Sequence, residues 1–195
     1  CIPDYEYKER VQRCAAILVR EGLDVLIVNG NEADYANPRY FSGFWPLFER
    51  SGVAIAANGD AALMVGPESS VFGADRNKLD KIFTLLAYRE SANPAYPELK
   101  PDTFHDVFKA IGVTGKKLRI GVASFLDTSM VIFNAIREAF PEAELVDAGY
   151  IMVELRKIKS ESELACLREG YRIANIATEE VIKAIRPGMT ELQMV

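Results

Sequence analysis

Residues that build metal and nucleophile sites are scarce in this sequence of 195 residues, which has one histidine and three cysteines. Cys1, Cys14 and Cys166 are far apart and form no CxxC pair, and His105 completes no familiar zinc spacing with them. A two-metal hydrolytic site needs clustered carboxylates and histidines, which this composition does not supply. We therefore predict that the chain holds no metal and no catalytic residue, and that His105 is a solvated surface side chain.

Long apolar runs, basic stripes and phosphate-binding loops are also missing. No apolar segment approaches the roughly 20 residues that span a bilayer, so no membrane association is expected. The formal net charge is -5 and no basic stretch exceeds residues 156–159, which argues against nucleic acid as a partner. No glycine-rich loop has the spacing of a phosphate cradle, which disfavours a free-standing nucleotide-binding protein. Cys14 and Cys166 lie among apolar residues of helical segments, so we expect buried thiols and a cytoplasmic location.

Apolar residues make up 49% of the sequence and charged residues 26%, which is enough to bury a core. Apolar positions recur at three- and four-residue steps over residues 4–22, which predicts a helix ended by Gly22. The run 25–28 suits a strand buried on both faces. Asn58-Gly59-Asp60 predicts a hairpin of 52–57 with 62–65. Further strands are expected at 82–87, 118–123 and 145–146, and further helices at 104–111 and 128–140.

The alternation of strands and helices, interrupted by an early hairpin, defines the expected architecture. It predicts an α/β fold in which a mixed β-sheet is flanked by helices on both faces. The Pro-containing stretch 91–101 is expected to be a surface loop. The segment around Tyr150 is expected to connect this domain to a long helix over 161–185. Its apolar positions should bury one face, but part of its surface should be abnormally apolar because its neighbours in a second domain are absent.

Two capping boxes mark the end of the sequence. Ser160 and Glu163 form the first, in which each side chain satisfies a backbone amide at the start of the long helix. A second begins at Thr190, but the sequence ends before the helix that this capping box would start, so we expect the sequence to be truncated. We therefore expect one α/β domain at residues 1–155 and, at residues 156–195, the junction and first helix of a second domain.

Three short motifs resemble those of a known family. Residues 37–44 (NPRYFSGF) resemble the N-x-x-Y-x-[ST]-G-F signature of N-terminal domains in the creatinase, prolidase and aminopeptidase P family. Residues 156–160, with Glu163 following, are similar to the R-x-I-K-S-x-x-E junction where the catalytic domain of that family begins. Residues 187–191 resemble the P-G-M-T-E that comes about one helix later. The resemblance covers essentially the whole chain and implies the creatinase/prolidase N-terminal fold, which is ribonuclease H-like.

The motif residues have physical interpretations of their own. Gly43 permits a turn that a side chain would obstruct, and Tyr40 with Phe44 supplies a buried aromatic plug. The second motif lies at the junction between domains. We assign structural rather than chemical roles to the motif residues Tyr40, Gly43, Phe44, Arg156, Lys159 and Glu163.

The loop after the first motif has the composition of a substrate-binding element. In creatinase-like relatives, an aromatic-x-Arg at about this place reaches across a dimer and lines the partner's active site, and Phe48-Glu49-Arg50 is the match here. A planar guanidinium suits a substrate carboxylate, and aromatic walls exclude water from it. The resemblance therefore implies that Trp45, Phe48 and Arg50 bind substrate. The alternative for Arg50 is a surface salt bridge.

The resemblance also implies what the parent protein does. It implies a C–N bond hydrolase with two divalent metals (Mn, Zn or Co) held in a C-terminal catalytic domain by Asp, Asp, His, Glu and Glu. The chain would then be the non-catalytic N-terminal domain, inactive alone, that packs on its own catalytic domain and serves homodimerisation and substrate access. An Xaa-Pro peptidase acting on a small peptide is favoured, and a creatinase-type amidinohydrolase acting on a small amide is the alternative. A catalytically dead relative used as a protein-interaction module also remains open.

Overall fold

The computed structural model describes residues 2–47, 49–90, 96–126 and 128–194. The chain divides into two compact units. The larger unit is Asp4–Lys157, and the smaller unit contains the chain from Ile158 onward together with Ile2 and Pro3. Among the described residues, no helix is both long enough and apolar enough to cross a bilayer.

A six-stranded mixed sheet forms the centre of the larger unit, in the order β4-β3-β2-β1-β5-β6. Strand β1 pairs antiparallel with β2 and parallel with β5, so the two kinds of strand pairing meet at the middle of the sheet. Strands β2 and β3 are antiparallel, as the Asn58-Gly59-Asp60 turn predicts, and the outer pairs are parallel. The strands are β1 (Val25–Gly30), β2 (Ser51–Ala56), β3 (Ala61–Val65), β4 (Ile82–Thr84), β5 (Arg119–Ala123) and β6 (Glu144–Asp147).

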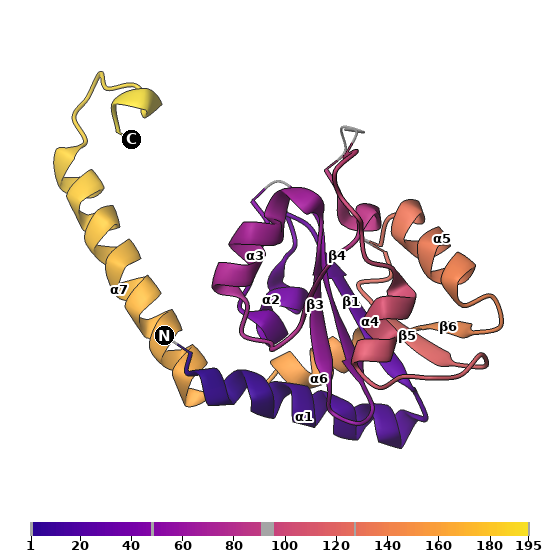
Figure 1. The fold of residues 1–195 in the computed structure, drawn as a ribbon. Helices are drawn as coiled ribbons and strands as arrows, with labels where there is room; N and C mark the ends of the chain where they lie inside the picture. Colours follow the sequence, from indigo (N-terminus) through magenta and orange to yellow (C-terminus); the bar gives the residue numbers. More distant parts are fainter. Residues whose placement is uncertain (1, 48, 91–95, 127, 195) are drawn as a thin grey trace. The chain divides into compact units, whose positions relative to one another are not determined.

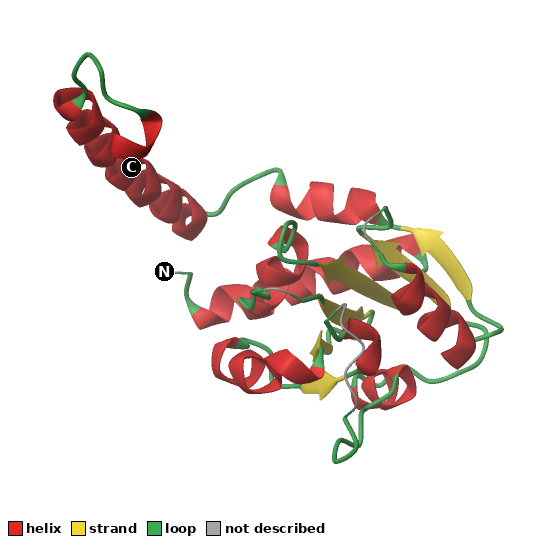
Figure 2. Ribbon diagram, turned by 90° about the horizontal axis from the view of Figure 1, so that it is seen from above, coloured by secondary structure: helices red, strands yellow, loops and turns green. Residues whose placement is uncertain are grey.

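Helices cover both faces of this sheet, which confirms the predicted fold class (Figures 1 and 2). One apolar cluster joins α1, α2 and α6 to the side chains of Leu26 and Val28. The other joins α4 and α5 to Val25 and Ile27. Strand β1 is therefore buried on both faces, as its uninterrupted apolar run predicts. The helices are α1 (Asp4–Glu21), α2 (Ala36–Ser42), α3 (Ser70–Arg76), α4 (Phe104–Ala110), α5 (Met130–Ala139) and α6 (Gly149–Arg156).

The structure corrects several sequence-based boundaries. The strand expected at 82–87 ends at Thr84, because Leu86–Tyr88 turns into a 3-10 helix (η2). The connecting segment around Tyr150 is instead the helix α6, whose buried side chains pack under the sheet. The short helices α2 and α3 were not expected either, since, unlike the equally short α4, they do not repeat large apolar residues at three- and four-residue steps.

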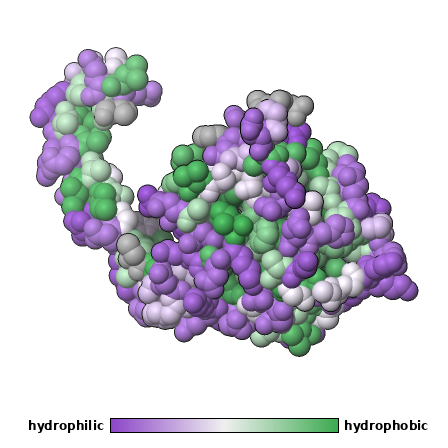
Figure 3. Space-filling view, in the orientation of Figure 1, coloured by the Kyte–Doolittle hydropathy of each residue, from purple (hydrophilic) through white to green (hydrophobic). Residues whose placement is uncertain are grey.

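The smaller unit contains one long helix, α7 (Glu161–Ala184), and the short 3-10 helix η3 (Glu191–Gln193). The predicted capping box is present: the Ser160 amide donates to Glu163 Oε2 at 2.8 Å, and the Glu163 amide donates to Ser160 Oγ at 3.1 Å. The expectation of a buried face was wrong, since no residue of α7 is buried, and large apolar side chains lie among the polar ones along it (Figure 3). The expectation of a buried thiol holds for Cys14 but not for Cys166, which is exposed. A single helix offers no second layer against which to bury a face.

Candidate functional site: the loop between α2 and β2

Helix α2 carries the first motif and fixes where the following loop starts. Its last turn buries Tyr40 and Phe41, and Gly43 ends it in the left-handed conformation with φ 69°. The Gly43 amide donates to the Arg39 carbonyl, and a Cβ at Gly43 would lie 2.9 Å from Lys78 Cγ. These contacts agree with the interpretation of Gly43 as a residue that permits a turn which a side chain would obstruct.

Tyr40 ties this helix to two others. Its hydroxyl accepts from Arg13 Nη2 at 2.9 Å and donates to the Leu155 carbonyl of α6 at 3.2 Å. Its carbonyl accepts from Arg10 Nη1 at 2.8 Å, and the Arg10 guanidinium lies 4.3 Å from the centre of the Tyr40 ring. Together with the fully buried Phe44, Tyr40 forms the aromatic plug that the sequence predicts.

The motif residues near the domain boundary fall into two groups. Arg156 donates to Asn37 Oδ1, so the ends of the first and second motifs meet within the larger unit although 119 residues separate them. Asn37 in turn donates to Ser124 Oγ at 2.9 Å. Lys159 is exposed, and Glu163 completes the cap of α7 in the smaller unit.

The loop itself begins with a layer of aromatic rings. The ring of Phe44 meets Phe72 of α3 edge-on at 5.7 Å, and the partly buried Trp45 meets the same ring at 5.9 Å. The guanidinium of Arg39, which is exposed, lies 4.7 Å from the centre of the Trp45 ring. Trp45 therefore presents an aromatic and cationic surface at the edge of the core. The predicted site residue Phe48 lies outside the described residues.

Arg50, the predicted carboxylate-binding residue, stands directly before β2. It is partly buried, and within the described part of the chain it forms no ion pair and no side-chain hydrogen bond. The surface salt bridge considered as its alternative is therefore not seen there. Its substrate role stays a prediction.

Glu49, which the sequence does not single out, is only 2% exposed. Burial, followed by the charges of Glu68 and Glu90, raises the pKa of Glu49 to about 8, against a weaker opposing effect of the Ser69 amide. Burial alone would raise the pKa of Glu68 too, but hydrogen bonds from Tyr96 and from backbone amides bring it below its ordinary value. The available signal was the position of a carboxylate between an aromatic residue and an apolar strand.

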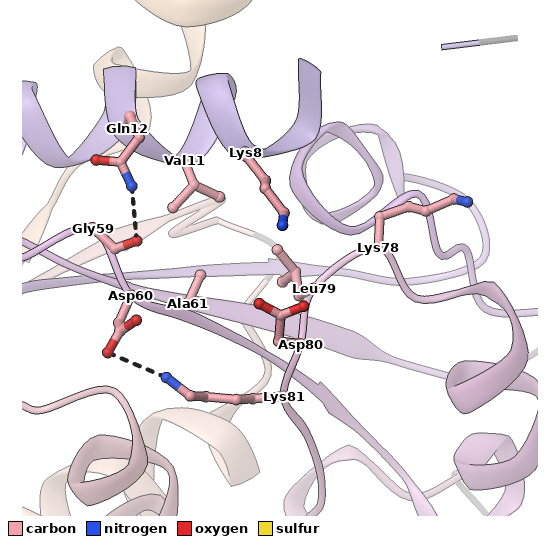
Figure 4. A pocket seen from close by; sticks show the side chains of 10 residues that line it. All are labelled: Lys8, Val11, Gln12, Gly59, Asp60, Ala61, Lys78, Leu79, Asp80 and Lys81. Atoms are coloured by element: carbon pink, nitrogen blue, oxygen red, sulfur yellow. Dashed lines mark hydrogen bonds and ion pairs between the residues drawn. The ribbon is translucent and has the colours of Figure 1, made fainter. Parts of the chain in front are cut away.

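A cavity of about 180 Å³ lies away from this loop, between α1, the β2–β3 turn and the segment before β4 (Figure 4). Two of its lysines form ion pairs: Lys81 turns toward Asp60 at 3.2 Å (Figure 4), and Lys78 pairs with Asp4, outside the cavity, at 2.9 Å. Gln12 also spans it, donating to the Gly59 carbonyl at 3.2 Å. The described residues that line the cavity include no serine, cysteine or histidine.

Metal ligands do not converge in the part of the chain that the structure describes, where no group of three or more His, Cys, Asp or Glu side chains could hold an ion. His105 is exposed and meets the Phe140 ring edge-on at 4.8 Å. This placement agrees with the interpretation of His105 as a surface side chain. The two divalent metals implied by the motifs therefore do not fit the residues present here.

Comparison with known proteins adds a family and a fold. Residues 10–158 match the family model described as the creatinase/prolidase N-terminal domain. The chain is similar to creatinase from Bacillus sp. (strain B-0618), with 27% identity over 192 residues, which cover 97% of this chain and 43% of that protein. The chain thus spans less than half the length of this curated relative.

Solved structures show the same architecture. Prolidase from Pyrococcus horikoshii OT3 has a TM-score of 0.68 and 18% identity, over 95% of this chain and 46% of the prolidase. The Xaa-Pro dipeptidase from Bacillus anthracis has a TM-score of 0.66 and 21% identity, over 96% and 46% of the two chains. X-Pro aminopeptidase from Thermotoga maritima MSB8 has a TM-score of 0.67 and 21% identity, over 94% and 46%. At these identities the likeness shows the fold alone.

Proposed function

Because the chain belongs to the creatinase/prolidase N-terminal domain family, we propose that it is the accessory domain of a C–N bond hydrolase of the Xaa-Pro peptidase type. In this proposal the two divalent metals (Mn, Zn or Co) and the catalytic ligands belong to a C-terminal catalytic domain. The domain described here packs on that catalytic domain, takes part in a homodimer in the cytoplasm and shapes the entry of a small peptide substrate.

The observation that carries the proposal is the composition and geometry of the loop after α2. Trp45 offers an aromatic face at the edge of the core, and Arg50 holds a guanidinium that no carboxylate of the described chain neutralises. A partly buried arginine in the same loop as an aromatic side chain is suited to bind the carboxylate of a peptide. The rigid end of α2 at Gly43 fixes where this loop begins.

A second candidate follows from the sequence similarity to creatinase, which favours an amidinohydrolase acting on a small amide. The two candidates separate in one assay of the full-length protein, with added manganese, zinc or cobalt, on Xaa-Pro dipeptides and on creatine. Hydrolysis of the dipeptides supports the peptidase, and hydrolysis of creatine supports the alternative. Metal-dependent turnover of either substrate by the 195-residue chain alone would contradict an accessory role.

Replacing Arg50 by alanine in the full-length protein tests the loop directly. Loss of a charge-assisted hydrogen bond costs about 1.5–3 kcal/mol, so we expect KM to rise roughly tenfold to a hundredfold. The free energy of unfolding should change by no more than about 0.5 kcal/mol, because Arg50 has no ion pair to lose among the described residues. Steady-state kinetics and urea unfolding of the same preparations measure the two quantities.

Arg76→Ala is the matched control. Arg76 lies over Phe72 in the neighbouring helix α3, but Asp75 already neutralises it at 3.0 Å. We expect its removal to leave KM unchanged. If Arg50→Ala unfolds the domain while KM per folded molecule stays the same, Arg50 is a structural residue and the substrate role is lost.

A further inference from the structure

Glu49 is buried in the loop between α2 and β2, and among the described residues only the Ser69 amide favours its ionised form. Only 2% of the residue is exposed, and neither Oε1 nor Oε2 has a hydrogen-bond partner among the described residues. A carboxylate buried in this way loses its hydration, and the weak effect of the Ser69 amide offsets only a small part of that loss. An ionised Glu49 would therefore be a large unfavourable term in the folded state.

The carboxyl group of Glu68 also has a buried oxygen without a hydrogen-bond donor among the described residues. Glu68, in the 3-10 turn Pro67–Ser69 (η1), accepts at Oε1 from the Tyr96 hydroxyl and, at 3.4 Å, from the Glu90 amide. Its Oε2 is buried without a donor in the described chain. Glu49 and Glu68 act on each other directly as side-chain neighbours. Two adjacent carboxylates repel, but one added proton turns one of them into a donor for the other.

We propose that Glu49 is protonated and donates its proton to Glu68 Oε2, and that this shared proton fastens the loop carrying Trp45 and Arg50 to the turn at Pro67–Ser69. One proton satisfies oxygens on both side chains. When Glu49 ionises, the proton passes to solvent, two like charges remain in a buried place, and the loop separates from the turn. The shared proton thus makes the attachment of this surface loop to the turn dependent on pH. This proposal is independent of the proposed function.

The charged groups around the pair favour this assignment. Glu90 adds a second negative charge near Glu49, while the hydrogen bonds of Glu68 keep that partner ionised and able to accept. Tyr96 does not compete for the proton, since burial and the neighbouring carboxylates raise its pKa to about 12. The pKa of Glu49 rises from its ordinary 4.5 to about 8, so the fastening would hold at neutral pH and loosen in mild alkali.

The fluorescence of Trp45 can report whether the loop is attached to the turn. Trp45 is the single tryptophan, and it lies four residues before Glu49 in the same loop. We expect its fluorescence in the 195-residue chain to change in one step centred near pH 8 on titration from about pH 6 to about pH 9.5. Glu49→Gln should abolish the step, because the glutamine amide donates to Glu68 at every pH. A wild-type chain without a step, or a step that survives in Glu49→Gln, would overturn the proposal.

Glu90→Gln is the matched control, since it removes the nearby charge and leaves the shared proton in place. We expect its step to persist at a lower pH, because the like-charge repulsion that raises the pKa of Glu49 is weaker. Carbon-13 NMR of the Glu49 carboxyl in the wild-type chain needs no substitution and does not depend on the folding of a variant. A midpoint near 8 supports the shared proton, and a midpoint near 4.5 contradicts it.

Unfolding gives an independent measure with a defined sign. Between pH 4.5 and about 8 the folded chain keeps the Glu49 proton and the unfolded chain does not. The unfolding equilibrium constant should therefore rise with pH in this window, by up to about tenfold per pH unit, and level off above it. Glu49→Gln should lack this contribution. Equal slopes for the two proteins would count against the proposal.

Discussion

Replacing Arg10 by alanine is expected to destabilise the larger unit by about 3–5 kcal/mol, the range for breaking a buried ion pair from one side. Arg10 is 2% exposed and donates to the buried Glu6 carboxylate at 2.7 Å and to the Tyr40 carbonyl at 2.8 Å. Its guanidinium also lies over the rings of Tyr40 and Tyr7. The substitution removes all of these contacts and leaves the charge of Glu6 without that arginine. Urea unfolding followed by circular dichroism measures the loss.

A double variant separates charge from packing. In Glu6→Gln with Arg10→Met, both charges go and much of the volume stays, so we expect a smaller loss than for Arg10→Ala alone. Arg10→Lys keeps the charge but not the planar fork that reaches Glu6 and Tyr40 together, and should fall between them. If Arg10→Ala unfolds at the wild-type urea concentration, the buried ion pair contributes nothing to stability.

Tyr88→Ala is expected to cost a similar amount, about 3–5 kcal/mol, because it removes a fully buried aromatic side chain from the second apolar cluster. The Tyr88 ring packs on the backbone of β2, where a Cβ at Gly52 would lie 2.5 Å from its hydroxyl oxygen. That hydroxyl donates to the buried Asn29 Oδ1 at 2.7 Å. Burial also raises the pKa of Tyr88, so the donor stays protonated in neutral solution. Thermal and urea unfolding give the loss.

Milder substitutions divide this effect into parts. Tyr88→Phe keeps the ring and leaves Asn29 Oδ1 without its donor, which should cost about 1–3 kcal/mol. Gly52→Ala forces a methyl group against the ring and should cost a comparable amount. Tyr5→Ala is the exposed control, at 62% exposure, and should change stability by no more than about 0.5 kcal/mol. Equal losses for Tyr5→Ala and Tyr88→Ala would contradict the role given to burial.

The sequence predicts the sheet better than the short helices. The apolar run of β1 and the turn at 58–60 carry strong local signals, so the hairpin and the mixed sheet could be predicted. Helices α2 and α3 lack the repeat of large apolar residues that reveals the equally short α4, and α6 is apolar at every position from 150 to 153, so no single face stands out. They form because tertiary packing selects them, and that selection is not visible in a local window. Helix α7 shows the opposite case. Its clear apolar period predicts the helix correctly but does not predict which residues pack against its apolar face.

The candidate site could be predicted only in part, and for a physical reason. The aromatic and arginine residues at 45–50 can be recognised in the sequence by their types alone. The end of α2 at Gly43 can also be predicted, because glycine adopts the left-handed conformation readily. The state of Glu49 depends on Glu68 and Glu90, which approach it from other segments of the chain. From the sequence alone, a glutamate is expected to be solvated, because its neighbours in space are not known. The position of Arg39 over the Trp45 ring is hidden for the same reason.

The pairing of β1 has a consequence for the order in which the domain assembles. Val25 pairs with Ala56 on one side and with Ile120 on the other, so the second partnership closes a far longer loop than the first. Longer closures cost more chain entropy and are slower, which favours early formation of the β1–β2–β3 meander. On the ribosome, the free side of β1 would then wait as an unpaired edge until β5 is synthesised, exposed to association with other nascent chains. Pulse-labelled hydrogen exchange during refolding should show the amides of β2 and β3 protected before those of β5, and the reverse order would contradict this sequence of events.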